Sequence, residues 1–237
     1  MIVSHAHKFI YLRTEKTGST ALTAALAEYC GREENLKANL RTPISRHLPW
    51  ISGGLQRRFP EVFGLHYHAT AEQVRRILGP KVWDSYFKFA VERNPWERQI
   101  SLFYHRRGRD GGVPGDFDRA QRSWTYNLLH HNRLNNWGVY AIGDEIVADQ
   151  VIRYQDLNDA LPGLFDRIGL PQDLVLPRRN FGHGGERQHY STYYTPVSRD
   201  LVANWYRREI EAFGFTFDDQ GQPQTDNAGP AVAQPIQ

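Results

Sequence analysis

Residues 8–31 of the chain read KFIYLRTEKTGSTALTAALAEYCG. The first part, residues 8–13, is short and apolar in its middle, which is typical of a buried strand. Small residues follow at 14–20, and beyond them apolar side chains recur at helical spacing until Gly31, a residue type that commonly ends helices. This stretch therefore predicts a strand, a turn and a helix in direct succession.

The same order of elements recurs along the chain. Residues 86–92 and 147–154 indicate two further strands, and each is followed by a segment with helical periodicity. A short strand is predicted at 62–66, before a helix whose start at Thr70 has the spacing of a capping box with Gln73. Strands that alternate with helices predict an α/β fold, with a P-loop-like central parallel β-sheet flanked by helices on both faces.

The length of 237 residues suits one domain with a sizeable core. We expect a single domain over residues 1–217, which includes a polar, proline-containing excursion at 31–60. Residues 218–237 are rich in Gln, Pro, Gly and Ala, a composition that cannot bury a core. This last segment therefore predicts a disordered C-terminal tail.

Charge and hydrophobicity argue against two classes of partner. The net charge of +3 is too small to indicate a nucleic acid, and no apolar run is long enough to cross a membrane. The first residues lack the apolar segment of a signal peptide, and the single cysteine, Cys30, cannot form an intrachain disulfide. We therefore expect a protein without a membrane anchor, located in the cytoplasm.

The turn at 14–20 has the composition of an anion-binding site. It leads into a helix, where unpaired backbone N–H groups bind oxyanions, and Gly18 lets the backbone approach a ligand closely. Lys16 adds a positive charge. Three hydroxyl donors are supplied by Thr17, Ser19 and Thr20. The order differs from a Walker A motif, because the lysine precedes the glycine and the earlier glycine is missing. An ordinary helix-capping turn is the alternative.

A second candidate site follows the strand predicted at 86–92. Arg93 comes directly after this strand, and Ser101 lies on the next helix, away from its apolar stripe. Taken alone, an Arg93 paired with Glu97 and a solvated Ser101 are the simpler interpretation. Together with the turn at 14–20, the two sites predict a ligand with two separated anionic groups, bound at the carboxyl ends of the strands.

Two motifs give the sequence a specific resemblance to a known family. Residues 16–20, Lys-Thr-Gly-Ser-Thr, resemble the 5′-phosphosulfate loop of the sulfotransferases that use PAPS (3′-phosphoadenosine-5′-phosphosulfate). Residues 93–101 resemble their 3′-phosphate motif, R-[ND]-P-x-x-R-x-x-S. The similarity is greatest to the carbohydrate branch with the heparan 2-O- and chondroitin-type enzymes, in a form that resembles a bacterial member. The resemblance extends over residues 8–215 and implies PAPS as the donor, with no metal required.

His66 and His68 flank Tyr67 after the strand predicted at 62–66. Residues i and i+2 of a strand face the same side, so both imidazoles would point the same way. By the resemblance, a His-x-His at this place holds the catalytic base, which we assign to His68 with His66 in support. A histidine suits the role because its pKa lies near neutral pH. A metal-binding pair and two packed, hydrogen-bonded histidines are the alternatives.

The resemblance implies an in-line transfer of the sulfuryl group. Lys16 and the amides of its turn would stabilise the leaving phosphate, and His68 would take the proton of the acceptor hydroxyl. Arg93 and Ser101 would hold the 3′-phosphate and so select PAPS over ATP-like donors. The acceptor implied by the family is a carbohydrate hydroxyl. The sequence contains no pattern that indicates the oligomeric state.

Later segments match the family less closely. The loop at 177–195 is rich in Arg, Gly and His, and Arg187 within it is a candidate phosphate ligand, as is Arg178 on weaker grounds. A solvated basic loop is the alternative. Trp124 and Tyr126 are candidates to approach the adenine, with core packing as the other interpretation.

Two other functions compete with sulfuryl transfer. A P-loop-type kinase for a small metabolite would need Mg²⁺ and a Walker lysine, which the turn at 14–20 does not supply in the usual order. A non-catalytic module that binds nucleotides or sulfated glycans is the second alternative, and a histidine placed as a base, His68, argues against it.

Overall fold

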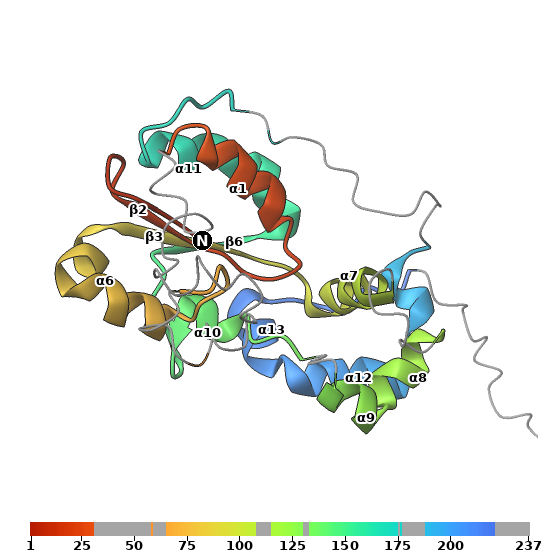
Figure 1. Cartoon of the computed structure of the whole chain (residues 1–237). Helices are drawn as coiled ribbons and strands as arrows, with labels where there is room; N and C mark the ends of the chain where they lie inside the picture. The colour runs from red at the N-terminus through yellow and green to blue at the C-terminus, as the bar shows by residue number, and fades with distance from the viewer. Residues whose placement is uncertain are drawn as a thin grey trace, which may run out of the picture.

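The computed structural model describes residues 1–30, 58, 65–107, 115–129, 133–174, 176 and 188–220. Its centre is a four-stranded sheet with the order β1-β2-β3-β6 (Figure 1). The strands are β1 (Ile2–Ser4), β2 (Phe9–Leu12), β3 (Phe87–Glu92) and β6 (Gln150–Arg153). The last three are parallel to one another, as the alternation of strands and helices predicts.

Strand β1 was not predicted from the sequence. It pairs antiparallel with β2, with Ile2 opposite Tyr11, and forms the edge of the sheet. A segment of three residues is too short to show a period, and a hairpin partner can be recognised only once the two strands are side by side. The sheet is therefore a parallel core of three strands with one antiparallel edge.

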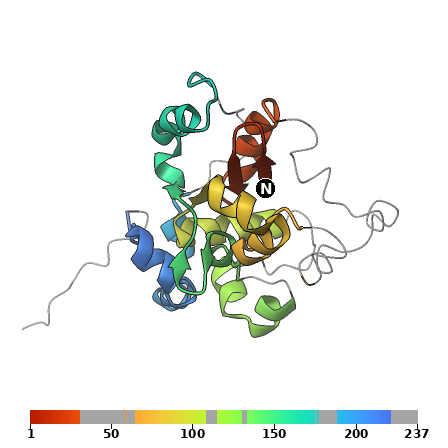
Figure 2. The same ribbon diagram turned by 90° about the vertical axis from the view of Figure 1, so that its left-hand side faces the viewer.

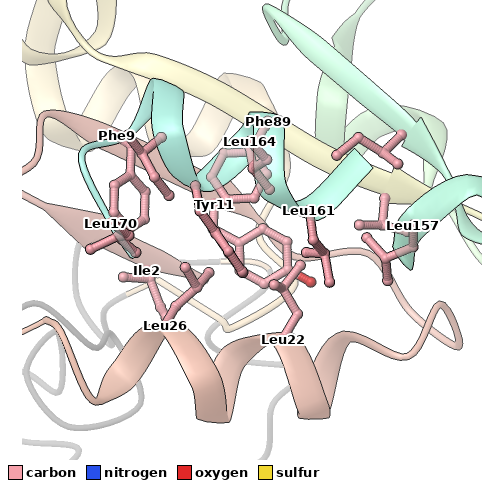
Figure 3. Packing of buried hydrophobic residues seen from close by; sticks show 14 of the residues in the cluster. Ile2, Phe9, Tyr11, Leu22, Leu26, Phe89, Leu157, Leu161, Leu164 and Leu170 are labelled. Carbon is pink, nitrogen blue, oxygen red and sulfur yellow. The ribbon is translucent and has the colours of Figure 1, made fainter. Parts of the chain in front are cut away.

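One face of the sheet is covered by α1 (Ser19–Ala27) and α11 (Leu157–Arg167). Figure 1 and Figure 2 show these two helices, in red and teal, on the same side of the sheet. Figure 3 shows how leucines of both helices pack against Phe9, Tyr11 and Phe89 of the strands. Because side chains alternate along a strand, Phe9 and Tyr11 face this layer while their neighbours face the opposite one.

The opposite face is covered by α6 (Ala71–Ser85) and α10 (Trp137–Tyr140). Helix α6 begins with the capping box predicted between Thr70 and Gln73, and it bends at Gly79, where φ is 75°. A short hairpin of β4 (Ala141–Ile142) and β5 (Glu145–Ile146) follows α10. Helices on both faces confirm the predicted α/β architecture.

A third group of helices lies beyond the carboxyl ends of the strands (Figure 1). It contains α7 (Pro95–Arg107), α8 (Phe117–Arg122), α9 (Trp124–Leu129) and α12 (Pro196–Trp205). Helix α13 (Arg207–Phe213) follows α12 and lies next to α10 (Figure 1), where Phe213 contacts Tyr140. These helices share an aromatic core in which Trp96, Phe117, Tyr194 and Phe217 make edge-on contacts. The described residues also contain two 3₁₀ turns, η1 (Tyr154–Asp156) after β6 and η2 (Tyr190–Tyr193) before α12.

Some predicted elements differ from the structure or fall outside it. Of the strand expected at 62–66, residues 62–64 lie outside the described residues, and the remaining two are not in a strand. Most of the excursion at 31–60 and residues 221–237 of the predicted tail also lie outside them. Within the described part, no helix combines the length and apolarity needed to cross a bilayer.

Candidate active site

The strand register brings the predicted anion sites to one edge of the sheet. Leu12 of β2 lies opposite Ala90 of β3, and Glu92 of β3 lies opposite Arg153 of β6. The segments that follow these three parallel strands therefore start at the same edge. In open α/β sheets this edge is where ligands bind.

The Lys16 turn, residues 14–18, contains two residues with a left-handed backbone conformation. Lys16 has φ of 63° and Gly18 has φ of 69°, and α1 begins at Ser19. A left-handed conformation costs a non-glycine residue roughly 1–2 kcal/mol and persists only where the surroundings enforce it. Here Thr14 donates a hydrogen bond to the carbonyl of Val91 in β3, and its hydroxyl lies 2.8 Å from that of Thr17.

Arg13 was not singled out from the sequence, yet it orients two of the predicted hydroxyls. Its buried guanidinium donates from Nε to Ser19 Oγ and from Nη2 to Thr20 Oγ1, both at 3.1 Å. A hydroxyl that accepts from an arginine keeps its own proton for another acceptor. The Ser19 and Thr20 hydroxyls are therefore able to donate hydrogen bonds to a ligand. Burial of the guanidinium lowers the pKa of Arg13.

Arg93 pairs with Glu97, as the simpler interpretation held. Its Nε and Nη2 lie 3.0 and 2.9 Å from Glu97 Oε2. The side chains are 23% and 35% exposed, and such ion pairs contribute only about 0–1 kcal/mol. Because the ion pair is this weak, it does not prevent an anionic ligand from competing with Glu97 for the guanidinium. Glu97 and Ser101 are four residues apart on α7 and share a face, so such a ligand could also reach Ser101.

Tyr154, the first residue after β6, contacts both sites. A Cβ on Gly18 would lie 2.7 Å from Cε2 of the Tyr154 ring. The Arg93 guanidinium lies over the same ring, 4.8 Å from its centroid. One aromatic side chain thus separates the Lys16 turn from Arg93. From the sequence Tyr154 was only the end of a strand, because its role depends on the parallel pairing of β3 and β6.

His66 and His68 lie in a turn rather than a strand. Nδ1 of His68 is 2.8 Å from the carbonyl oxygen of Arg13. A carbonyl only accepts, so Nδ1 carries the proton and Nε2 holds the free electron pair. The backbone N–H of His68 donates to Nδ1 of His66 at 3.1 Å, so a neutral His66 carries its proton on Nε2.

Burial keeps His68 uncharged. Burial lowers the pKa of His68 to about 2, and the positive charge of Arg13 acts in the same direction. His68 is therefore a neutral imidazole at neutral pH, with Nε2 able to accept a proton. His66 is buried, its ring centroid is 5.7 Å from that of His68, and it supports the turn through Nδ1.

A buried ion pair lies behind Arg93. Arg98 and Glu92 are both fully buried and are joined at 2.5 Å. Nη2 of Arg98 also lies 3.5 Å from Glu209 Oε1, and its guanidinium packs 4.3 Å from the Tyr206 ring centroid. The arginine within the predicted 93–101 motif is therefore part of the protein interior and is out of reach of a ligand.

Other predicted residues stand apart from this edge or outside the described chain. Arg187 and Arg178 lie outside the described residues. Tyr126 is buried in the aromatic core, as the packing interpretation held, whereas Trp124 is 73% exposed on α9. Among the described residues, no three His, Cys, Asp or Glu side chains group in a way that could hold a metal.

Comparisons with known proteins add independent findings. A sequence model of the sulfotransferase family matches residues 1–125, which contain the Lys16 turn, both histidines, Arg93 and Ser101. A protein of Archaeoglobus fulgidus described as uncharacterized is 27% identical over 109 residues, covering 44% of this chain and 85% of that protein. The crystal structure of a sulfotransferase from Alicyclobacillus acidocaldarius matches 89% of this chain and 96% of its own, at 14% identity and a TM-score of 0.47.

Proposed function

Because the chain belongs to the sulfotransferase family, we propose that it transfers the sulfuryl group of PAPS to a hydroxyl of a carbohydrate acceptor. The observation that carries the proposal is the contact of Tyr154 with both Gly18 and Arg93. It leaves the two anion-binding sites one aromatic side chain apart, a separation that a single nucleotide with phosphates at both ends of its ribose can span.

The donor would bind with its 5′-phosphosulfate at the Lys16 turn. Backbone N–H groups at the start of α1, the Ser19 and Thr20 hydroxyls and the Lys16 ammonium are all donors for this group. The 3′-phosphate would bind at Arg93 and Ser101 and take over the place of Glu97 on the guanidinium. Arg187, in the loop outside the described residues, is a further candidate ligand.

The reaction would proceed by in-line displacement. The acceptor oxygen forms a bond to sulfur while the bond between sulfur and the phosphate oxygen breaks, which leaves 3′-phosphoadenosine-5′-phosphate (PAP) and a sulfate ester. The proton of the acceptor hydroxyl passes to Nε2 of His68, the nitrogen that Arg13 leaves unprotonated. Lys16 stabilises the negative charge that gathers on the leaving phosphate.

The low pKa of His68 belongs to the protein without its donor. A negatively charged PAPS beside the imidazole favours the protonated form and so raises the pKa toward neutrality. Donor binding would thus convert His68 from a very weak base into an effective one. A histidine held neutral before the donor arrives also avoids repelling Lys16 and Arg13.

The acceptor class and the location are the remaining parts of the proposal. The carbohydrate acceptor is supported by the resemblance of His66-Tyr67-His68 to the carbohydrate branch of the family. A cytoplasmic location is supported by the single cysteine, which suits a reducing compartment.

Thermal unfolding with two nucleotides tests the donor. PAP at a hundred times its dissociation constant stabilises a one-site protein by about 2.7 kcal/mol, whereas ATP with Mg²⁺ should shift the midpoint far less. In Arg93→Ala the shift by PAP should shrink to that produced by 5′-AMP. Equal shifts by PAP and ATP with Mg²⁺ in the parent protein would contradict a sulfotransferase donor site.

Labelled PAPS then tests the acceptor. Incubation with a panel of glycans and simple alcohols should transfer label to a carbohydrate, and His68→Ala should greatly slow the transfer while PAP still stabilises the variant. Transfer to simple alcohols alone would overturn the carbohydrate assignment and leave the donor assignment intact.

A further inference from the structure

We propose that Asn136 is a positioning residue that fixes the separation of the two anion-binding sites; the inference rests on the function proposed above. Asn136 is the residue before α10 and has 1% of its surface exposed. It lies far along the chain from both sites, and the 93–101 and 16–20 motifs give no indication of it.

The side-chain amide of Asn136 binds the backbone of Glu15, the residue before Lys16. Its Oδ1 accepts from the Glu15 N–H at 2.9 Å, and its Nδ2 donates to the Glu15 carbonyl at 3.1 Å. Both polar groups of one backbone residue are therefore bound by one side chain. The next residue is Lys16 with its left-handed φ of 63°, a conformation that needs its surroundings to hold it.

The same amide also reaches the residue before Arg93. Nδ2 of Asn136 lies 3.3 Å from Glu92 Oε1. That oxygen also accepts the backbone N–H of Arg93 at 2.7 Å. One side chain therefore links the peptide before Lys16 to the carboxylate that binds the backbone of Arg93.

Glu92 is a fixed anchor for this link. Besides its ion pair with Arg98, its Oε2 accepts from the Tyr140 hydroxyl at 3.1 Å, and the carboxylate is fully buried. Moving a buried carboxylate away from its donors leaves a desolvated charge unpaired, which costs several kcal/mol. Asn136 thus links the Lys16 turn to a buried, hydrogen-bonded carboxylate in the protein interior.

Only an amide meets all three contacts. The side chain must accept from one N–H and donate to both a carbonyl and a carboxylate, which asparagine does with one acceptor and two donors. Aspartate of the same size keeps the acceptor, loses the donors and places a second carboxylate beside Glu92. Alanine loses all three contacts without adding a charge.

The neighbouring residue offers a matched control. Asn135 is exposed and accepts the Gly138 N–H at 3.0 Å, without contact to Glu15 or Glu92. Asn135→Asp keeps this acceptor and should change little. Asn136→Ala, Asn136→Asp and the two corresponding Asn135 variants are compared under conditions where urea titration shows each to be folded.

Amide hydrogen exchange without ligand tests the positioning directly. In Asn136→Ala the Glu15 amide should exchange about ten-fold faster or more, because its acceptor is gone, while the amides of β2 keep the protection of the parent. The Asn135 variants should match the parent. Unchanged exchange at residues 14–18 in Asn136→Ala would overturn the inference, whichever ligand the protein binds.

Nucleotides with one or two phosphate groups test the separation. PAP carries both 3′- and 5′-phosphates, whereas 3′-AMP and 5′-AMP carry one each. In Asn136→Ala the affinity for PAP should fall about ten-fold, and for each monophosphate about two-fold or less, because only a two-ended ligand depends on the spacing. An equal loss for all three ligands would overturn the positioning role, since a general destabilisation acts on them alike.

The two measurements separate this inference from the proposed function. If the parent protein binds PAP no better than 5′-AMP, the proposed donor is wrong. The exchange of the Glu15 amide in Asn136→Ala still decides whether Asn136 holds the Lys16 turn.

Discussion

The two ends of β2 carry turns with the same unusual backbone conformation at a lysine. Lys8, in the hairpin before β2, has φ of 50°, and Lys16, in the turn after it, has φ of 63°. At the amino end the lysine is exposed, and its carbonyl accepts the Phe87 N–H at 2.9 Å. At the carboxyl end the turn contacts three distant segments, through the Val91 carbonyl and the side chains of Asn136 and Tyr154.

The difference shows that a lysine with a left-handed backbone conformation does not by itself indicate a functional site. A hairpin turn accepts positive φ because it matches the twist of the two strands it joins. The carboxyl-end turn joins a strand to a helix and needs support from buried polar groups far along the chain. Each of the following predictions pairs a residue of the carboxyl end with a counterpart at the amino end.

The largest expected effect is the loss of the base. His68→Ala should lower the turnover of labelled PAPS and acceptor by about 1,000-fold, within the range typical of general bases. Its counterpart is His5, which lies in the hairpin 2.8 Å from the Tyr86 hydroxyl. His5→Ala should retain the parent rate, and near-parent turnover in His68→Ala would remove the histidine from the mechanism.

The two lysines give the next largest effect. Lys16→Ala should lower turnover by about 100-fold, since it removes a charge that stabilises the leaving phosphate. Lys8→Ala has a comparable backbone strain and should leave turnover unchanged. Steady-state rates at saturating acceptor provide the comparison, and equal rates in the two variants would show that the Lys16 charge does not contribute to the reaction.

Two glycines with the same φ sharpen the comparison in stability. Gly18 and Gly169 have φ of 69° and 68°, so an alanine at either costs roughly 1 kcal/mol from the backbone. A Cβ at Gly169 would lie 3.7 Å from His7 Nδ1, an ordinary contact, whereas at Gly18 it would meet the Tyr154 ring at 2.7 Å. Gly18→Ala should therefore be destabilised by about 1 kcal/mol more.

Urea unfolding of the two glycine variants, with and without PAP, measures this difference. PAP should stabilise Gly169→Ala as much as it stabilises the parent, and Gly18→Ala much less, because the displaced Tyr154 ring also contacts Arg93. Equal stabilities of the two variants and equal stabilisation by PAP would mean that the Tyr154 ring moves aside without consequence for either site.

The smallest expected effect is a pH dependence of stability. The pKa of His68 is lowered to about 2 in the folded protein, whereas the unfolded chain has a value near 6.5. Below pH 6.5 the unfolded chain therefore binds a proton that the folded protein does not. The stability that the neutral imidazole contributes is complete above pH 6.5 and is lost as the pH falls.

Urea unfolding at pH 7 and pH 5.5 gives the size of this contribution. Linkage predicts that His68 accounts for about 1 kcal/mol of the loss between these values. His68→Gln, which cannot titrate, should lack that part of the loss, while His5→Gln should keep it. A loss in His68→Gln equal to that of the parent would show that His68 is not held neutral.

Local patterns in the sequence predicted much of this architecture. The apolar residues of β2, β3 and β6 and the periodic helices between them predicted a parallel sheet covered on both faces. The turns at 14–20 and at Arg93 were also recognisable, because strand exits and helix starts have local signals such as glycine, proline and capping residues. The family followed from the same two segments, 16–20 and 93–101.

The tertiary structure alone decided what surrounds these residues. Asn136 is 121 positions from Glu15, Thr14 is 77 from Val91, and His68 is 55 from Arg13. Periodicity in a sequence records which side chains face the core, because that depends on a repeat of two or 3.6 residues. Contacts between distant segments depend on strand order and register, so the protonated nitrogen of His68 and the partners of Lys16 and Arg93 emerge only when the chain is packed.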